Sequence, residues 1–199
     1  MRQVVTALLW VALAAGAAHA ADGEGRFSIR GAGLLACETY VKERSVQSKA
    51  YYVIAGWLDG YLTALNQFSP DTYDATPFES TELLTYVIDG HCKKHPQDRL
   101  FPLVNTILVR LKNERLRTFS PFVTVKVGER QTRVYEEVVR RAQQELARRG
   151  HYRGKVDGKF GPAVEQALAG FQRKEKLAAT GFPDQATLWR LLRREPAGR

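Results

Sequence analysis

The sequence is poor in the residues that build redox, metal or nucleophilic chemistry: its 199 residues include two cysteines, four histidines and one methionine. It contains no His-Glu-x-x-His segment, which is typical of zinc hydrolases, and no Gly-x-Ser-x-Gly segment, which is typical of serine hydrolases. Paired carboxylates for glycan cleavage are not evident either, because Asp157 lies in a turn and Asp59 has no acidic partner. We therefore predict that the chain is not an enzyme and uses no cofactor.

Long apolar runs are absent after residue 20. Residues 4–15 are almost wholly apolar, but this run is shorter than the roughly 20 residues that a membrane-spanning helix needs. Arg2 precedes the run, and Ala18-His19-Ala20 follows it as a small-x-small cleavage sequence. We predict a signal peptide over residues 1–20 and a periplasmic mature chain without a transmembrane segment. The alternative is that the segment stays attached as an anchoring helix.

The two cysteines, Cys37 and Cys92, are predicted to form one disulfide, because an exported chain folds in an oxidising environment. The alternative is a metal site, since His91 and His95 flank Cys92. We predict the disulfide and no metal, with the two histidines at the C-terminal end of a helix, where positive charge is favoured.

Residues 30–117 show the three- and four-residue spacing of apolar side chains that is typical of helices. The clearest stripe runs from residue 51 to residue 65, after a shorter one at 34–41. Thr76-Pro77-Phe78-Glu79 resembles a capping box and predicts the start of a third helix. A fourth helix is expected through residues 103–111, with a start or a kink at Pro102. We interpret this range as a helical domain held by the disulfide, and the fold class as mainly α.

Residues 118–133 change in character. Val123, Val125 and Val127 alternate with polar residues, and a polar hinge over residues 128–131 follows. We predict a linker or one short strand here, then a domain over residues 134–193 and a flexible tail over residues 194–199.

The last domain is expected to contain three helices around a small core. The first covers residues 134–149 and ends at Gly150, the second begins at Pro162, and Asp184 caps the third. Between the first two, residues 150–162 hold four glycines together with Tyr152, Val156 and Phe160. Glycines at this density exclude a helix, and the regularly spaced apolar residues indicate a turn that is packed rather than solvated.

This C-terminal half resembles the type 1 peptidoglycan-binding domain of cell-wall enzymes and envelope proteins. The matching residues are Gln143, Leu146, Gly150, Tyr152, Gly154, Asp157, Gly158, Phe160, Gly161, Ala167, Phe171, Gln172, Leu177, Thr180, Gly181, Asp184, Thr187 and Leu188. Val164 and Gly170 depart from the usual pattern, at positions that concern helix packing. The resemblance implies a three-helix fold that holds peptidoglycan in a shallow groove beside the turn.

We assign the peptidoglycan contacts to five residues of this domain: Tyr152, Arg153, Asp157, Lys159 and Gln172. A tyrosine ring and a guanidinium suit a glycan and a stem carboxylate, and Lys159 and Gln172 are expected at the rim. The alternative for Tyr152 is a place in the core, where Phe160 and Phe171 are also expected.

The N-terminal half resembles small exported helical families with one disulfide, namely the Hde-type acid-stress chaperones and the immunity proteins of type VI secretion. The likeness lies in Cys37, in residues 56–61 and 83–92, and in His95-Pro96. It implies a domain that binds another periplasmic protein.

Charge is unevenly distributed. Residues 21–118 carry 12 Lys and Arg against 12 Asp and Glu, whereas residues 119–199 carry 17 against 9. The positive charge after residue 118 indicates either binding to an anionic polymer of the cell envelope or only a solvated helix face. Nucleic acid is an unsuitable partner for an exported protein. Our hypothesis is a non-catalytic peptidoglycan-binding protein that tethers a chaperone- or immunity-like domain to the cell wall. The alternative is an accessory subunit or catalytic component of a cell-wall hydrolase.

Overall fold

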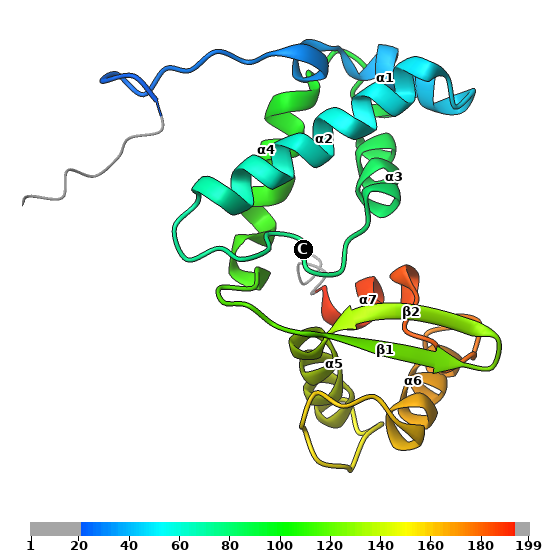
Figure 1. Cartoon of the computed structure of the whole chain (residues 1–199). Helices are drawn as coiled ribbons and strands as arrows, with labels where there is room; N and C mark the ends of the chain where they lie inside the picture. The colour runs from blue at the N-terminus through cyan, green and yellow to red at the C-terminus, as the bar shows by residue number, and fades with distance from the viewer. Residues whose placement is uncertain (1–20, 194–199) are drawn as a thin grey trace, which may run out of the picture.

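The computed structural model describes residues 21–193, so the predicted signal peptide and the predicted tail lie outside the described residues. The elements form two groups, one above the other in Figure 1. The first group contains two short 3-10 turns, Gly31–Leu34 and Lys112–Glu114, and helices α1 (Cys37–Ser45), α2 (Lys49–Phe68), α3 (Thr81–Cys92) and α4 (Leu100–Leu111). The second contains strands β1 (Phe122–Val127) and β2 (Arg130–Tyr135) and helices α5 (Glu136–Arg148), α6 (Pro162–Lys174) and α7 (Gln185–Leu192). The fold is mainly helical, as predicted, and no helix within residues 21–193 could cross a bilayer.

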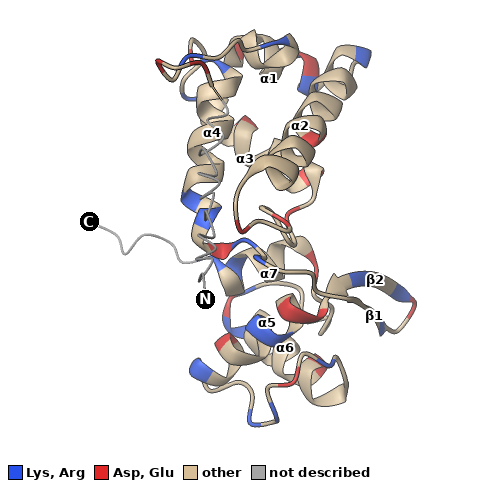
Figure 2. Ribbon diagram, turned by 60° about the vertical axis from the view of Figure 1, so that its left-hand side comes forward, with Lys and Arg blue, Asp and Glu red and all other residues tan. Residues whose placement is uncertain are grey.

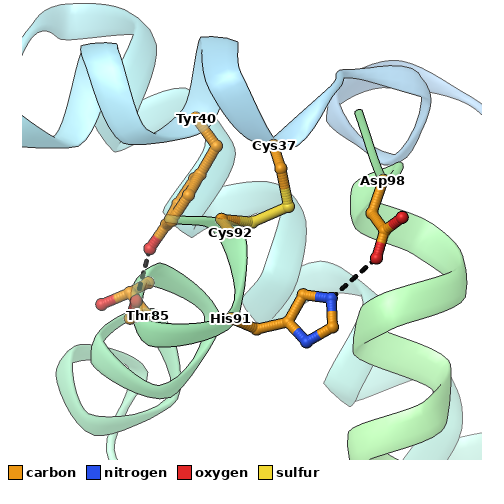
Figure 3. Close-up of a disulfide and its surroundings, with 6 residues drawn as sticks. All are labelled: Cys37, Tyr40, Thr85, His91, Cys92 and Asp98. Carbon is orange, nitrogen blue, oxygen red and sulfur yellow. Dashed lines mark hydrogen bonds and ion pairs between the residues drawn. A yellow bond between two sulfur atoms is a disulfide. The ribbon is translucent and has the colours of Figure 1, made fainter. Parts of the chain in front are cut away.

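The disulfide predicted between Cys37 and Cys92 is present and joins the start of α1 to the end of α3 (Figure 3). Both cysteines are fully buried, next to Tyr40, whose hydroxyl donates a 2.5 Å hydrogen bond to the Thr85 carbonyl. Apolar side chains of α2, α3 and α4 form the same core: Ile54, Leu58, Leu62, Leu84, Ile88, Leu100, Leu103, Val104, Leu108 and Leu111. The disulfide therefore lies inside the apolar core of the first group.

The third helix begins later than the sequence predicted. Ser80 is the N-cap of α3, and its hydroxyl accepts a hydrogen bond from the Leu83 N–H, so the helix starts at Thr81. The expected capping box does not form, because Glu79 turns its carboxylate toward Arg193 in the second group. Helix α4 begins at Leu100, which places Pro102 in the first turn, where the missing N–H breaks no helical hydrogen bond.

The segment predicted as a linker or one short strand is an antiparallel hairpin of two strands. The register runs from Phe122 opposite Tyr135 to Val127 opposite Arg130, and Gly128 takes a positive φ of 57° in the turn. Val134 belongs to this ladder, so the helix expected from residue 134 begins at Glu136 instead. Strand pairing and burial decide this, because Val134 lies in a core with Val125 and Leu188.

The two groups are joined by more than the chain between them. The side chain of Gln185 in α7 donates to the Phe78 carbonyl over 2.7 Å and accepts from the Ser80 N–H over 2.9 Å. Arg193 forms a buried ion pair with Glu79. Apolar contacts extend across the same boundary, since Leu116 and Phe78 pack with the core of the second group. The extended segment before α3 is therefore docked against α7.

Candidate functional site

A buried amide holds the glycine-rich turn between α5 and α6. Gln143 of α5 is completely buried, and its Oε1 accepts hydrogen bonds from the N–H groups of Asp157 and Gly158 at 3.0 and 2.8 Å. Its Nε2 donates to the Asp157 carboxylate at 3.1 Å and to the Lys159 carbonyl at 3.0 Å. One side chain thus satisfies several polar groups of the turn, which fixes the path of the backbone.

The same arrangement recurs between α6 and α7. Gln172 is completely buried, and its Oε1 accepts from the Gly181 N–H at 2.7 Å. Its Nε2 donates to the Phe182 carbonyl at 3.0 Å and to the Thr187 hydroxyl at 2.9 Å. Gln143 lies seven residues after Glu136, which is next to Gly158, and Gln172 lies seven residues after Glu165, which is next to Gly181. The module therefore contains two turns of related design.

The clamped glycines leave no room for a side chain. Gly158 and Gly181 have φ values of 78° and 70°, in the left-handed region that favours glycine. A Cβ at Gly158 would lie 2.6 Å from Cγ of Glu136, and a Cβ at Gly181 would lie 2.6 Å from Cγ of Glu165. Each turn is therefore pressed directly against the beginning of a helix.

Replacing Gln143 by alanine is expected to lower the free energy of unfolding by about 2–3 kcal/mol, because buried backbone N–H groups of the turn lose their acceptor. Chemical denaturation followed by circular dichroism measures the loss. The matched control is Gln144→Ala, since Gln144 is the exposed neighbour on the same helix and its loss should stay within about 0.5 kcal/mol. Equal losses of unfolding free energy for the two variants would show that the hydrogen bonds of the Gln143 amide do not stabilise the fold.

The structure corrects two of the five predicted contact residues. Gln172 is not at a rim, because its amide is buried and used by the turn. Tyr152 is also buried, with its hydroxyl donating to the Lys155 carbonyl at 2.9 Å, and its ring fills the space beside Gly154. Gln172 thus holds the turn between α6 and α7. Tyr152 packs inside the turn between α5 and α6, as its alternative assignment to the core predicted.

The other three predicted residues lie on the surface of the turn. Arg153 and Lys159 are exposed, and so is Lys155 between them, which gives the loop from α5 to α6 a basic edge (Figure 2). Asp157 is half-buried, and its pKa is lowered by the hydrogen bonds that it accepts from the Lys159 N–H and from Gln143. The Asp157 carboxylate therefore stabilises the turn through these hydrogen bonds.

A groove of about 400 Å³ lies between residues 113–121 and the first turns of α5. Four arginines line it, namely Arg115, Arg117, Arg140 and Arg141, together with Glu136 and Glu137. Glu136 is also the residue against which Gly158 is pressed, so the groove adjoins the clamped turn. Sequence reasoning did not find this groove, because one wall comes from the segment that follows α4.

The positive charge of the groove is only partly neutralised. Arg140 pairs with Glu136 at 2.8 Å and with Glu137 at 3.1 Å. Arg141 pairs with Glu137 at 3.3 Å and also donates to the carbonyls of Glu114 and Arg115. Carbonyl oxygens orient a guanidinium without cancelling its charge. The groove therefore suits a ligand that carries carboxylates.

Comparison with known proteins bears on this half of the chain. Residues 135–191 match the model of a family described as “Putative peptidoglycan binding domain”. No curated protein and no solved structure matches the chain significantly. The resemblance predicted for the N-terminal half finds no support in these comparisons. The resemblance predicted for the C-terminal half is confirmed. Residues 135–191, from the end of β2 to α7, form the domain that matches this peptidoglycan-binding family.

Proposed function

We propose that this protein is an exported, non-catalytic peptidoglycan-binding protein whose C-terminal domain keeps the helical N-terminal half at the cell wall. The family match over residues 135–191 carries the proposal. The buried disulfide between Cys37 and Cys92 supports a location outside the cytoplasm, where disulfides persist. The excess of basic residues after residue 118 supports an anionic partner.

The groove beside α5 is the proposed contact surface for the peptide stems of peptidoglycan. These stems carry carboxylates, and a guanidinium can bind a carboxylate through two parallel hydrogen bonds. The side chain of Arg117 is 59% exposed, and its guanidinium lies 3.8 Å from the Asp71 carboxylate. The other three arginines of the groove have shorter hydrogen bonds or ion pairs, so Arg117 is the most available for a ligand. Arg153, Lys155 and Lys159, exposed on the loop between α5 and α6, add further positive charge to this domain.

Reversing the charge of Arg117 in the groove is expected to weaken binding to purified sacculi about tenfold, because a charge-assisted hydrogen bond contributes on the order of 1.5 kcal/mol. The variant is Arg117→Glu in the full mature chain, and co-sedimentation over a range of sacculus concentrations measures the affinity. Lys49→Glu is the matched control, since Lys49 is exposed at the start of α2, outside the groove and the 135–191 domain, and should change affinity less than twofold.

Two results would contradict parts of this proposal. If the parent chain does not sediment with sacculi, the domain is used for another purpose, such as contacts with a protein. If the parent binds and both charge reversals bind equally well, peptidoglycan contacts a surface other than the groove. The binding function and its assignment to the groove are thus tested separately.

The N-terminal half is proposed to bind a periplasmic protein, in a chaperone-like or immunity-like role. The support is a set of exposed apolar side chains on α2 and α3: Tyr52, Val53 and Tyr86 are 61%, 70% and 65% exposed. Co-purification of the full chain with periplasmic extract tests this, with a Tyr52→Ser/Val53→Ser variant as the comparison. A partner that is retained equally by the variant would contact another surface.

The alternative is an accessory subunit or catalytic component of a cell-wall hydrolase, and it is favoured only by the occurrence of such binding domains on cell-wall enzymes. Zymography of the pure protein in a gel with embedded peptidoglycan separates the two. A clearing zone at the position of the intact chain would overturn the non-catalytic proposal.

A further inference from the structure

Three potential metal ligands gather at the C-terminal end of α3, in the N-terminal half of the protein. They are His91 in the last turn of α3 and His95 and Asp98 in the loop that follows (Figure 3 shows His91 and Asp98). One ligand atom from each lies within 4.8 Å of the other two. His91 Nε2 is 2.7 Å from Asp98 Oδ2, and the two imidazole rings have centroids 4.5 Å apart.

The backbone that carries these side chains is held on several sides. Cys92, next to His91, is tied to α1 by the disulfide. The His95 N–H donates to the His91 carbonyl at 3.1 Å, and the Asp98 N–H donates to the His95 carbonyl at 3.1 Å. The Asp98 carbonyl accepts from the Cys37 N–H at 2.8 Å. The three ligands therefore sit on a preformed frame, while His95 and Asp98 remain exposed to solvent.

Three cationic residues lie next to the cluster in the sequence: Lys93, Lys94 and Arg99. Lys93 is the closest lysine in sequence to His91, but its ammonium is paired with Asp89 at 2.7 Å. The guanidinium of Arg99, next to Asp98, donates a 2.6 Å hydrogen bond to the Leu34 carbonyl. These contacts direct Lys93 and Arg99 toward other partners, whereas Lys94, next to His95, is exposed to solvent.

We propose that His91, His95 and Asp98 form a surface site for a divalent transition metal of the zinc class. Two imidazoles and one carboxylate are ligands that Zn²⁺ binds at roughly 2.0–2.2 Å, which places neighbouring ligand atoms about 3.4 Å apart in a tetrahedral shell. The ligand atoms now lie within 4.8 Å of one another, and the exposed side chains of His95 and Asp98 are free of the packing that would prevent rotation toward that spacing. Calcium and magnesium prefer all-oxygen sites, and the disulfide withholds the thiolates that soft metals select.

The site differs from the metal alternative considered from the sequence. That alternative joined the histidines to the cysteines, whereas the cysteines are bonded to each other and Asp98 takes their place. Three protein ligands leave at least one coordination position for water or for an external ligand. The disulfide then has a second role, since it fixes the end of the helix that presents His91.

The test is a Zn²⁺ titration of the full mature chain, prepared with its disulfide intact and without an affinity tag that contains histidine. Competition with a chromophoric chelator is expected to show about one bound Zn²⁺ per chain, and Co²⁺ is expected to give the visible absorption of a low-coordinate site. His95→Ala and Asp98→Asn should each weaken Zn²⁺ binding about tenfold or more. Zn²⁺ should also raise the melting temperature of the parent but not of these variants.

Two matched substitutions serve as controls. Asp71→Asn removes an exposed carboxylate from the same half, and His151→Gln removes a histidine from the other half. Both should bind Zn²⁺ as the parent does. The proposal is overturned if the parent binds no Zn²⁺, or if Asp98→Asn and His95→Ala bind it as tightly as the controls. Circular dichroism and a thiol assay on each variant show that the fold and the disulfide are retained.

Discussion

Replacing Glu79 by alanine is expected to lower the free energy of unfolding by about 3–5 kcal/mol, because it removes the buried carboxylate that pairs with a buried guanidinium and leaves only the partly exposed Glu114 beside it. The side chain of Glu79 is completely buried and that of Arg193 is 8% exposed. Arg193 also lies over the Phe78 ring at 4.6 Å and within 3.3 Å of the Glu114 carboxylate. Removal of Glu79 therefore disturbs a contact between the two halves and not only a local pair.

Denaturant unfolding measures this loss, with Glu82→Ala as the matched control. Glu82 lies in the first turn of α3 and is exposed, so its removal should cost less than about 1 kcal/mol. A double variant, Glu79→Ala/Arg193→Ala, should recover part of the stability, because it no longer buries an unpaired charge. A loss below 1 kcal/mol for Glu79→Ala would mean that water reaches Arg193 and that the halves are less firmly docked.

Removing the disulfide with Cys37→Ala/Cys92→Ala is expected to lower the free energy of unfolding by about 4 kcal/mol. The two cysteines are 55 residues apart, and a closed loop of that length restricts the unfolded chain by this amount in the chain-entropy account. The lost sulfur atoms are buried next to Tyr40, so a small cavity adds to the effect. Urea unfolding of the parent and the variant measures the difference.

A reducing agent provides the control for this second prediction. The parent should lose stability in dithiothreitol and approach the variant, whereas the variant should not respond. If the oxidised parent and the double variant unfold at the same urea concentration, the disulfide contributes nothing to stability, and its role is confined to placing the end of α3.

The two halves of the protein are in direct contact. A binding domain that acts only as a tether needs no firm contact with what it carries. Here the Gln185 side chain and the Glu79–Arg193 pair join α7 to the segment before α3. One wall of the groove even comes from residues 113–121, which precede the matched domain. The N-terminal half therefore helps to shape the surface that we propose for peptidoglycan.

The peptidoglycan-binding domain was recognisable from the sequence because its signals are local. Turn glycines, the N-cap at Asp184 and the apolar stripes of α5 to α7 depend on neighbouring residues and follow a fixed spacing. The same holds for the helices of the first half, with the exception of where α1 and α3 begin. The disulfide was predictable because only two cysteines are present.

The tertiary structure decided what depends on contacts between distant residues. Tyr152 and Gln172 look like binding residues in the sequence, but the turns bury them. Val134 has the spacing of a helix residue, but pairing with Val123 makes it part of a strand. Helical periodicity and turn chemistry depend on residues that are close in the sequence, so the sequence alone predicts them. Burial, strand pairing and the ion pair between Glu79 and Arg193 depend on residues that come together only in the folded chain.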